Sequence, residues 1–502
     1  MITVKMLDAQ GKYLGRDCVF SIYPTDMRHV PFNRNVVFKG NGEINLECSE
    51  LPVILHGVVP IPGYGRTWVT IDNCGEGYKD GAVIDFVREG AVSRAWLVER
   101  EINKGGFAPS AKCLSLLNDA KALIQKAASA PSPKCYEYNM TALGAGMWAG
   151  ELMVVERART KIAAAKRKDF LFGCGFGYPF DNIPGAQEMF DSLFNYMTLP
   201  FYLASVEPEK GKPNYDRIDG PLEAIGSRDI LTKGHPLWWG FGYRGAGTPQ
   251  WAENYNWDEV QRTIKEICTT RVGRYRDSVK IFDVINEAHD WANTYNLTQD
   301  QQIEATKLCC DYTHETNPDV QAVINICQPY GEYGGQGKIL YGPVYDRIMT
   351  PLSYFERVRD RGIQYEILGI QLYNPARDML SIEQMLDRYA VFGKPIHITE
   401  LGVASYDKNM PYNYIDLVIG GLMIGLWHDF QWNERLQADW LEDFYTICYA
   451  HNSVEACTWW NFTDPAFCPA SGFYDEDGRE KEINYRLKAL QQSWGFNFGK
   501  KQ

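Results

Sequence analysis

The chain has 502 residues, of which 45% are hydrophobic and 13% aromatic, and its formal net charge is −12. Single hydrophobic cores rarely grow beyond about 250–300 residues, so this length predicts two or three structural units. The acidic balance argues against a nucleic-acid partner, because binding to phosphates depends on Lys and Arg. No stretch reaches the roughly 20 apolar residues of a membrane span, so no membrane partner is expected either.

The cysteines and histidines show no metal-binding pattern. The 13 cysteines include no C-x-x-C pair and the eight histidines no H-x-x-x-H spacing, so we expect buried free thiols, no metal and no cofactor. The N-terminus lacks the charged start and apolar run of a secretory signal. We therefore expect a cytoplasmic protein if Met1 is the native start, and a secreted one if a signal peptide has been removed.

Residues 1–100 contain short β-branched runs separated by Gly, Asn and Asp, which predicts a small antiparallel β-domain resembling a sandwich. The expected strands include ITVKML at Ile2–Leu7, CVFSIY at Cys18–Tyr23 and VILHGVV at Val53–Val59. Carbohydrate-binding modules often have this architecture, and so do inert spacers. A carbohydrate-binding module is one interpretation of this segment.

Residues 101–167 are expected to form a helical connector, because Ala, Leu, Lys and Arg recur at helical spacing over Pro109–Ala130 and Glu151–Lys168. Strand-like and helix-like runs then alternate through residues 168–502. The eight expected strands are Phe170–Cys174, Tyr196–Leu203, Ile230–Trp239, Val279–Asn286, Val320–Ile326, Glu366–Tyr373, Ile396–Glu400 and Ala456–Asn461. This count predicts a (β/α)8 TIM barrel. A doubly wound open sheet is the alternative, but no G-x-G-x-x-G follows the first strand.

Active sites of such barrels lie at the C-terminal ends of the strands. Two carboxylates meet that condition, since Glu287 closes the run IFDVINE and Glu400 closes PIHITE. Either Glu alone could simply cap a loop or pair with an Arg. Two carboxyl groups facing one another, one protonated and one ionised, are what cleavage of a glycosidic bond requires. Asn286 precedes Glu287 and offers an amide to a sugar hydroxyl.

These motifs carry a resemblance to a known family. FDVINEAHD at Phe282–Asp290 resembles the acid/base segment of family 10 glycoside hydrolases, the endo-β-1,4-xylanase family, and HITELGV at His397–Val403 resembles its nucleophile segment. Further segments that resemble the family follow in the right order, and these are KGHPLWWG at Lys233–Gly240, GIQLY at Gly369–Tyr373 and TWWNFTD at Thr458–Asp464. The resemblance covers about two thirds of the chain, residues 168–496.

The resemblance implies endo-acting hydrolysis of β-1,4-linked xylan by a retaining double displacement. Glu400 would attack the anomeric carbon, and Glu287 would protonate the leaving oxygen and then activate water. Retaining enzymes hold these two carboxyl groups about 5–5.5 Å apart. The resemblance also implies that Asn286 binds the 2-hydroxyl. The other expected sugar contacts lie at further strand ends, and they are His235, Trp239, Gln371, Tyr373 and Trp460.

Some positions depart from the family pattern. TLPFYL at Thr198–Leu203 stands where the family has Glu-Asn-x-x-Lys-Trp, and Gly240 and Tyr373 stand where it has His. A polysaccharide or oligosaccharide is the expected partner, but two alternatives to a xylanase stay open. One is a hydrolase of the same clan that acts on another β-glycan, and the other is a non-catalytic glycan-binding protein. The insertion at residues 404–431 is expected to form either a wall of the cleft or an exterior helix.

Overall fold

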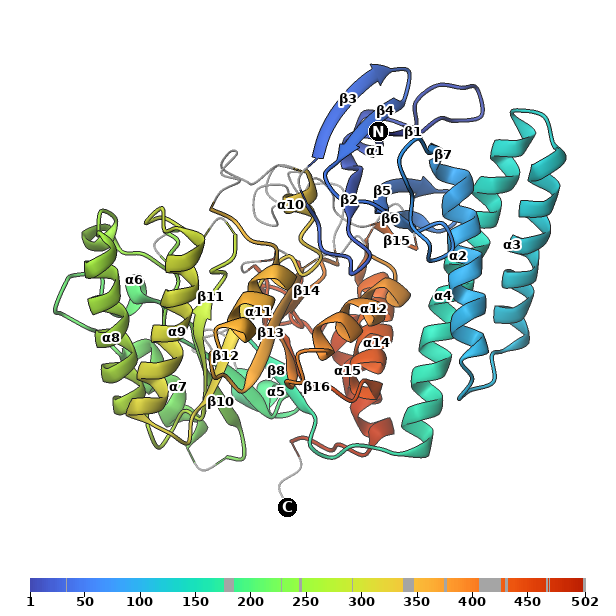
Figure 1. Ribbon diagram of the computed structural model, residues 1–502. Helices are drawn as coiled ribbons and strands as arrows, with labels where there is room; N and C mark the ends of the chain where they lie inside the picture. Colours follow the sequence, from blue (N-terminus) through green and yellow to red (C-terminus); the bar gives the residue numbers. More distant parts are fainter. Residues whose placement is uncertain are drawn as a thin grey trace.

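The computed structural model describes residues 1–32, 34–175, 185–226, 228–242, 246–290, 292–336, 347–373, 377–405, 426–428, 432–465, 468 and 470–499. A barrel occupies one side of the molecule, and a β-rich unit and a layer of long helices lie on the other (Figure 1). Across the described residues, no helix is both long and apolar enough to cross a membrane. Most of the expected insertion, residues 406–425 and 429–431, lies outside the described residues.

Eight parallel strands close into a barrel in the described part of the chain, in the order β10-β11-β12-β13-β14-β16-β8-β9. They are β8 (Leu171–Cys174), β9 (Tyr196–Pro200), β10 (Leu231–His235), β11 (Ile281–Asn286), β12 (Gln321–Ile326), β13 (Ile367–Tyr373), β14 (Ile396–Gly402) and β16 (Val454–Trp459). Each falls within or overlaps one of the eight expected strands, so the predicted (β/α)8 barrel is confirmed. Closure through β8, which pairs with both β16 and β9, excludes the open sheet.

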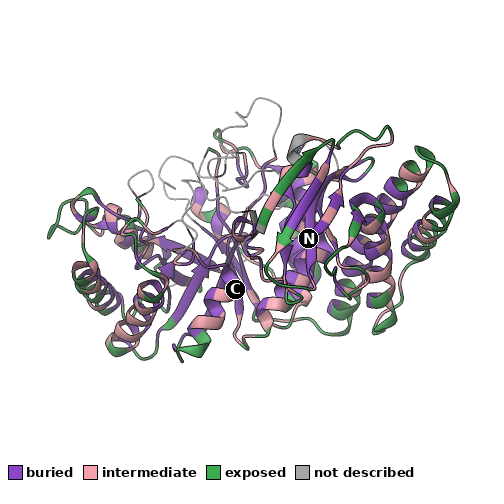
Figure 2. Ribbon diagram, turned by 45° about the horizontal axis from the view of Figure 1, so that its top comes forward, coloured by how far each residue is buried: buried purple, intermediate pink, exposed green. Residues whose placement is uncertain are grey.

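Helices cover the outside of the barrel, and the strands between them are buried along most of their length (Figure 2). The helices of this part of the chain are α5 (Ala186–Asp191), α6 (Leu203–Val206), α7 (Asp216–Ile225), α8 (Trp257–Arg274), α9 (Gln299–Thr316), α11 (Pro351–Asp360), α12 (Met379–Ala390), α14 (Glu434–Ala450) and α15 (Glu482–Trp494), together with α10 (Glu332–Gln336), which contacts β2 of the N-terminal unit. The sequence encodes several of their starts. At α8, for example, the Asn256 side chain and Glu259 form a capping box that satisfies backbone donors at the helix start.

The N-terminal β-unit has two four-stranded sheets, ordered β3-β4-β1-β7 and β15-β6-β5-β2. Their strands are β1 (Ile2–Lys5), β2 (Tyr23–Thr25), β3 (Arg34–Gly40), β4 (Glu43–Cys48), β5 (Ile54–Ile61), β6 (Gly65–Ile71), β7 (Val83–Asp85) and β15 (Leu426–Trp427). One prediction was wrong, because most of Cys18–Tyr23 belongs to helix α1 (Arg16–Ser21). Its apolar residues Cys18, Val19 and Ile22 face the core of this unit, and a short buried run looks the same in a helix as in a strand.

Three long helices connect the β-unit to the barrel: α2 (Phe86–Asn103), α3 (Ala111–Ser129) and α4 (Lys134–Ala164). The boundary expected at residue 100 falls inside α2. Helix α4 begins 17 residues before the expected Glu151. The sequence did not reveal this start, because the helix contains glycines that fit tightly against neighbours and interrupt the helical pattern. A side chain at Gly146 or Gly150 would press on Arg94 of α2. The barrel core is continuous with apolar residues of α2 and α4, such as Val98 and Met153.

Candidate active site

The two predicted catalytic carboxyl groups lie at the C-terminal end of the barrel. Glu287 directly follows β11, and Glu400 lies in β14 opposite Gln371 of β13. Their exposed fractions are 8% and 6%. Glu287 has a φ of +54°, a conformation that is uncommon for a residue with a side chain and that ends the strand abruptly. Its backbone N–H donates to the carbonyl of Asn325 at 2.9 Å, which ties this turn to β12.

Three amide side chains connect the two carboxyl groups. Gln371 Nε2 donates to Glu287 Oε1 at 2.9 Å and to Asn286 Oδ1 at 3.1 Å. Asn325 Nδ2 donates to the same Asn286 oxygen at 2.8 Å and to Glu400 Oε1 at 3.1 Å. With its oxygen held by two donors, the Asn286 amide has a fixed orientation, and its NH2 group faces away from those donors. The network therefore orients both acids at once.

Asn325 is a member of this network that the sequence analysis missed. It lies within the apolar run VINI of β12, which was interpreted only as a buried strand. Thr399 Oγ1 fixes its oxygen at 2.5 Å, and the absence of a side chain at Gly369 leaves space for it, since a Cβ there would come within 2.8 Å of Asn325 Oδ1. A polar residue inside a buried strand needs a hydrogen-bond partner, and this rule could have identified Asn325 as a candidate site residue from the sequence.

Each carboxyl group also receives a hydrogen bond from an aromatic side chain. Trp239 Nε1 donates to Glu287 Oε2 at 3.0 Å, and the Tyr373 hydroxyl donates to Glu400 Oε2 at 2.9 Å. Both aromatic residues were predicted to contact sugar. The structure places them against the carboxyl groups themselves, so each holds one acid in a single orientation.

A fully buried charge network lies beside Glu400. Asp283 Oδ2 accepts from Lys233 Nζ at 2.7 Å and contacts His235 Nδ1 at 2.6 Å, while His235 Nε2 lies 3.6 Å from Glu400 Oε1. Burial alone would raise the pKa of Asp283, but Lys233 and His235 outweigh it and hold that pKa below its usual value. Burial lowers the pKa of His235 despite Asp283, which favours the neutral imidazole. The orientation of the His235 ring is thus set by its contact with the Asp283 carboxylate.

The pKa values of both predicted catalytic acids are raised. Burial raises the pKa of Glu287 to about 7, against the opposing hydrogen bonds from Gln371 and Trp239. Burial and then the negative charge of Glu287 raise the pKa of Glu400 to about 8. Because the charge of Glu287 acts on Glu400, the titrations of the two acids are linked. One proton shared by this pair near neutral pH gives the acid and base forms that glycosidic cleavage needs.

Trp460 is the aromatic residue expected to stack on a sugar, and its ring lies edge-on to His235 with centroids 5.2 Å apart. Its neighbour Trp459 points the other way, fully buried, and donates from Nε1 to the carbonyl of Ser471 at 2.7 Å. This alternation is what adjacent residues of a strand predict. A Cβ at Gly175 would collide with the Trp460 ring, so the glycine leaves room for it.

Tyr202 is a second residue of the site that the sequence analysis missed. It follows β9, and its ring lies 5.3 Å from His235 and 5.9 Å from Trp239 between centroids. Burial and then the charges of Glu400 and Glu287 raise its pKa well above the usual value, so its hydroxyl lies near both acids. The segment TLPFYL lacks the polar residues of the family pattern, but its Tyr202 supplies an aromatic ring to the site.

One buried cluster of the described residues has groups of the kinds that bind zinc: His289, Asp290 and Cys327, with ligand atoms within 4.8 Å of one another. Cys327 Sγ lies 2.6 Å from Asp290 Oδ2, however, whereas S and O ligands of one tetrahedral zinc lie about 3.5 Å apart. His289 Nδ1 is already paired with the Tyr333 hydroxyl at 2.7 Å. The Cys327–Asp290 contact indicates a hydrogen bond between these two groups, while the other ring nitrogen of His289, Nε2, has no hydrogen-bond partner among the described residues.

Comparison with known proteins identifies related chains. Endo-1,4-beta-xylanase B of Thermotoga neapolitana is 23% identical over 65% of this chain and 90% of its own length, and endo-1,4-beta-xylanase 1 of Arabidopsis thaliana is 25% identical over 57% of this chain and 26% of its own. The crystal structure of native xylanase 10B from Thermotoga maritima superposes with a TM-score of 0.51 at 18% identity, over 68% of this chain and 98% of that one, which shows a shared fold. The family model described as Glycosyl hydrolase family 10 matches residues 161–483, more than half of the chain. The chain belongs to glycosyl hydrolase family 10.

Proposed function

We propose that this protein is a retaining endo-1,4-β-xylanase, with Glu400 as the nucleophile and Glu287 as the general acid and base. The observation that carries the proposal is the pair of buried carboxyl groups at the ends of β11 and β14, joined through Gln371, Asn286 and Asn325. In the first step Glu400 attacks the anomeric carbon while the leaving oxygen takes the proton of Glu287. In the second step Glu287 removes a proton from water, which attacks the same carbon and releases Glu400.

The surroundings of Glu400 support its role as the nucleophile. Two neutral donors, Asn325 and Tyr373, hold its two oxygens, and each of those oxygens is therefore kept at a fixed angle to the cleft. Lys233 lies behind His235 and lowers the pKa of Glu400 against the effect of burial. Burial raises the pKa of Glu287 to about 7, which keeps a proton available for donation near neutral pH. The pKa of Glu400 is raised further, to about 8, so the two roles are assigned from the motifs and the hydrogen bonds rather than from these values.

The substrate proposal depends on relatives that are named endo-1,4-beta-xylanases, and the family supports a β-linked polysaccharide. One observation favours a second candidate, a β-glycan other than plain xylan. The end of β9 places Tyr202 beside His235 and Trp239, where the family pattern has charged and amide groups. A subsite lined by rings binds sugar faces rather than individual hydroxyl groups, so it discriminates less between pentose and hexose units.

The experiment that tests the function is product analysis on xylan, mixed-linkage glucan and mannan with the full-length protein. We expect new reducing ends from xylan, released as a series of oligosaccharides because the cleavage is internal. Release from glucan or mannan in place of xylan would establish the second candidate. A folded sample that binds these glycans but releases nothing would instead show a non-catalytic glycan-binding protein.

Substitution of the acid tests the assignment of roles. Glu287→Gln should lower kcat on polysaccharide by about 10²–10⁴-fold, the usual contribution of general acid–base catalysis. The loss should be smaller on an aryl glycoside whose phenol leaves without a proton. Glu455→Gln is the matched control, since Glu455 is 46% exposed on its side chain and lies at the opposite end of the barrel in β16. Equal activity of Glu287→Gln and the wild type would refute the assignment.

A further inference from the structure

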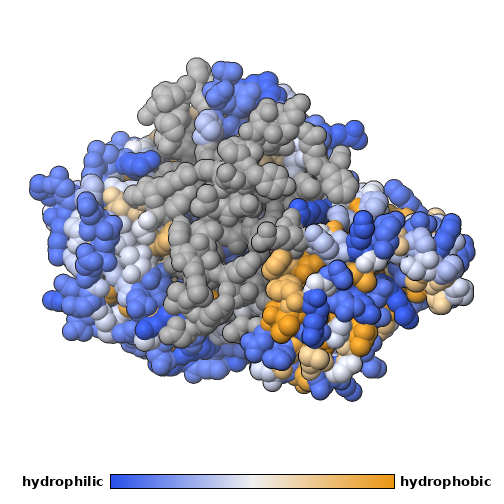
Figure 3. Space-filling view, turned by 90° about the horizontal axis from the view of Figure 1, so that it is seen from above, coloured by the Kyte–Doolittle hydropathy of each residue, from blue (hydrophilic) through white to orange (hydrophobic). Residues whose placement is uncertain are grey.

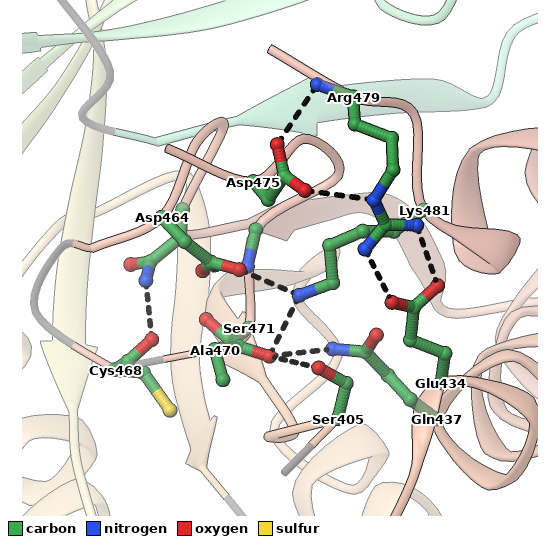
Figure 4. Close-up of polar contacts among 12 residues, drawn as sticks. Ser405, Glu434, Gln437, Asp464, Cys468, Ala470, Ser471, Asp475, Arg479 and Lys481 are labelled. Carbon is green, nitrogen blue, oxygen red and sulfur yellow. Dashed lines mark hydrogen bonds and ion pairs between the residues drawn. The ribbon is translucent and has the colours of Figure 1, made fainter. Parts of the chain in front are cut away.

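A buried lysine lies under the loop that follows β16. Lys481 is 2% exposed, its Nζ pairs with Asp464 Oδ2 at 2.6 Å, and it donates to the carbonyl of Ala470 at 2.9 Å (Figure 4). Lysine is almost never fully buried unless it is paired. Here it makes two bonds to two distant points of the same loop, which holds residues 464 and 470 at a fixed separation.

The Ala470 carbonyl is the point where this loop meets the segment after the nucleophile strand. Besides Lys481, it accepts from the backbone N–H of Ser405 at 2.8 Å, from Ser405 Oγ at 2.8 Å and from Gln437 Nε2 at 3.3 Å (Figure 4). Ser405 lies three residues beyond the end of β14. Ala470 has a φ of +55°, which is uncommon for alanine and is maintained only by such surrounding bonds.

The same loop carries Trp460 at its start. The Trp460 N–H donates to the carbonyl of Leu401, the residue after Glu400, at 2.7 Å. Trp459 is fixed through Ser471, and the Asp464 carboxylate accepts from the N–H of Gly472 at 2.7 Å. The loop is therefore folded back on itself, and both of its sides connect to β14.

We propose that Lys481 is a positioning residue that sets the Trp460 ring beside His235 and the nucleophile. Its ammonium group neutralises Asp464 inside the loop and, through Ala470, locks the loop to Ser405. The inference rests on the proposed hydrolase function, in which Trp460 contacts sugar. Lys481 itself does not reach the cleft, so it acts on sugar binding rather than on the chemical step.

Replacement of Lys481 by Met tests this role. Loosening this loop leaves both glutamates in place, because they lie at β11 and β14. It would no longer hold the Trp460 ring in one position, so the substrate and the transition state would lose the same contact. We expect KM for xylo-oligosaccharides to rise by about 5- to 20-fold while kcat changes by less than about threefold, the pattern of lost uniform binding. The sugar-induced change in tryptophan fluorescence should shrink in parallel, and Trp460→Phe should reduce it as well, leaving the part that comes from Trp239.

Two further variants keep the test decisive. Lys488→Met removes a 28% exposed lysine from α15, the helix that begins directly after Lys481, and should leave KM unchanged. Ser405→Ala removes one donor to Ala470 without burying an unpaired charge, so it should fold even if Lys481→Met does not, and it should raise KM by about two- to threefold. A folded Lys481→Met with wild-type KM and a lowered Tm, or Ser405→Ala with wild-type KM, would overturn the proposal. A wild type without hydrolytic activity would overturn the proposed function instead.

Discussion

The two glutamates of the site are surrounded by neutral donors and by each other. Gln371 and Trp239 hold Glu287, while Asn325 and Tyr373 hold Glu400. Neutral donors fix orientation without forcing ionisation, whereas an arginine in the same place would lower the pKa and keep the carboxylate charged near neutral pH. Such an arrangement allows Glu287 to give up a proton and take one back during a reaction cycle.

The raised pKa values predict the pH dependence of activity. The reaction needs one proton on the pair, so it stops when both acids are protonated at low pH and when both are ionised at high pH. With pKa values of about 7 and about 8, kcat/KM should follow a bell centred between pH 7 and pH 8. Initial rates on a soluble xylo-oligosaccharide from pH 4 to pH 10 measure it. A maximum at pH 4–5, near the ordinary pKa of about 4.3 for Glu, would contradict this environment.

Most of the site residues could be predicted at the level of single residues. His235, Asn286, Gln371, Tyr373 and Trp460 were expected at strand ends, and the structure brings them to the same end of the barrel as the two glutamates. Whether each contacts sugar stays a prediction. Asn325, Asp283 and Tyr202 were missed. The first two are buried within apolar strands, and their role depends on neighbours that a single strand does not show.

At the level of elements, the approach of β12 to β13 depends on one glycine. A Cβ at Gly369 would press on Asn325 Oδ1 at 2.8 Å and on Thr399 Cγ2 at 2.9 Å, both parts of the network that orients Glu400. Strands of the barrel cannot move apart without breaking their ladder, so an added methyl group displaces the side chains instead.

Gly369→Ala should therefore reduce stability by about 1–3 kcal/mol, the usual cost of overpacking. It should also lower kcat, because Asn325 no longer reaches Glu400 and Asn286 together. Gly220→Ala is the control, because Gly220 lies in α7 with no atom within 4 Å of the added Cβ, and alanine favours a helix. Urea denaturation and steady-state kinetics on both variants check this. Gly369→Ala with wild-type kcat would show that the network does not orient the nucleophile.

The barrel strands were predictable because each is a short, mostly buried run bounded by turns. Helix α1 was not, since Cys18–Ile22 gives a run as apolar as a strand and only packing between the two sheets selects the helix. The early start of α4 could not be predicted either. Its glycines disfavour a helix in the local sequence, and they are explained only by close contacts with Arg94 and Ile61. Where tertiary contacts determine an element, local sequence does not reveal it.

At the level of the whole molecule, the N-terminal β-unit is joined closely to the catalytic end of the barrel. Arg377, beyond β13, donates to the Tyr23 hydroxyl at 3.0 Å, pairs with Glu332 at 2.8 Å and lies over the rings of Trp68 and Tyr330. Strand β15, which comes from the insertion after β14, pairs with β6 of the same unit.

From above, the described surface is mostly hydrophilic with one apolar group of residues (Figure 3). The carbohydrate-binding interpretation of this unit stays a prediction.

This connection predicts that the β-unit and the barrel unfold together. Arg377→Met breaks a buried ion pair and two ring contacts, and it should cost about 2–4 kcal/mol in the free energy of unfolding. Arg359→Met, at a 61% exposed surface pair with Asp360, should cost less than about 1 kcal/mol. Calorimetry should show a single unfolding transition, and Arg377→Met should lower the Tm of that whole transition. Two transitions, with only one of them shifted, would show two independent units.

The central claim is a double displacement by Glu400 and Glu287, and the stereochemistry of the first product tests it most directly. Proton NMR, recorded during the first minutes of xylo-oligosaccharide hydrolysis, distinguishes the anomers before they equilibrate. Two inversions at the anomeric carbon leave the configuration unchanged, so the account predicts that the β-anomer appears first and the α-anomer grows only by mutarotation. An α-anomer released first would mean a single displacement by water and would contradict the assignment of Glu400 as nucleophile.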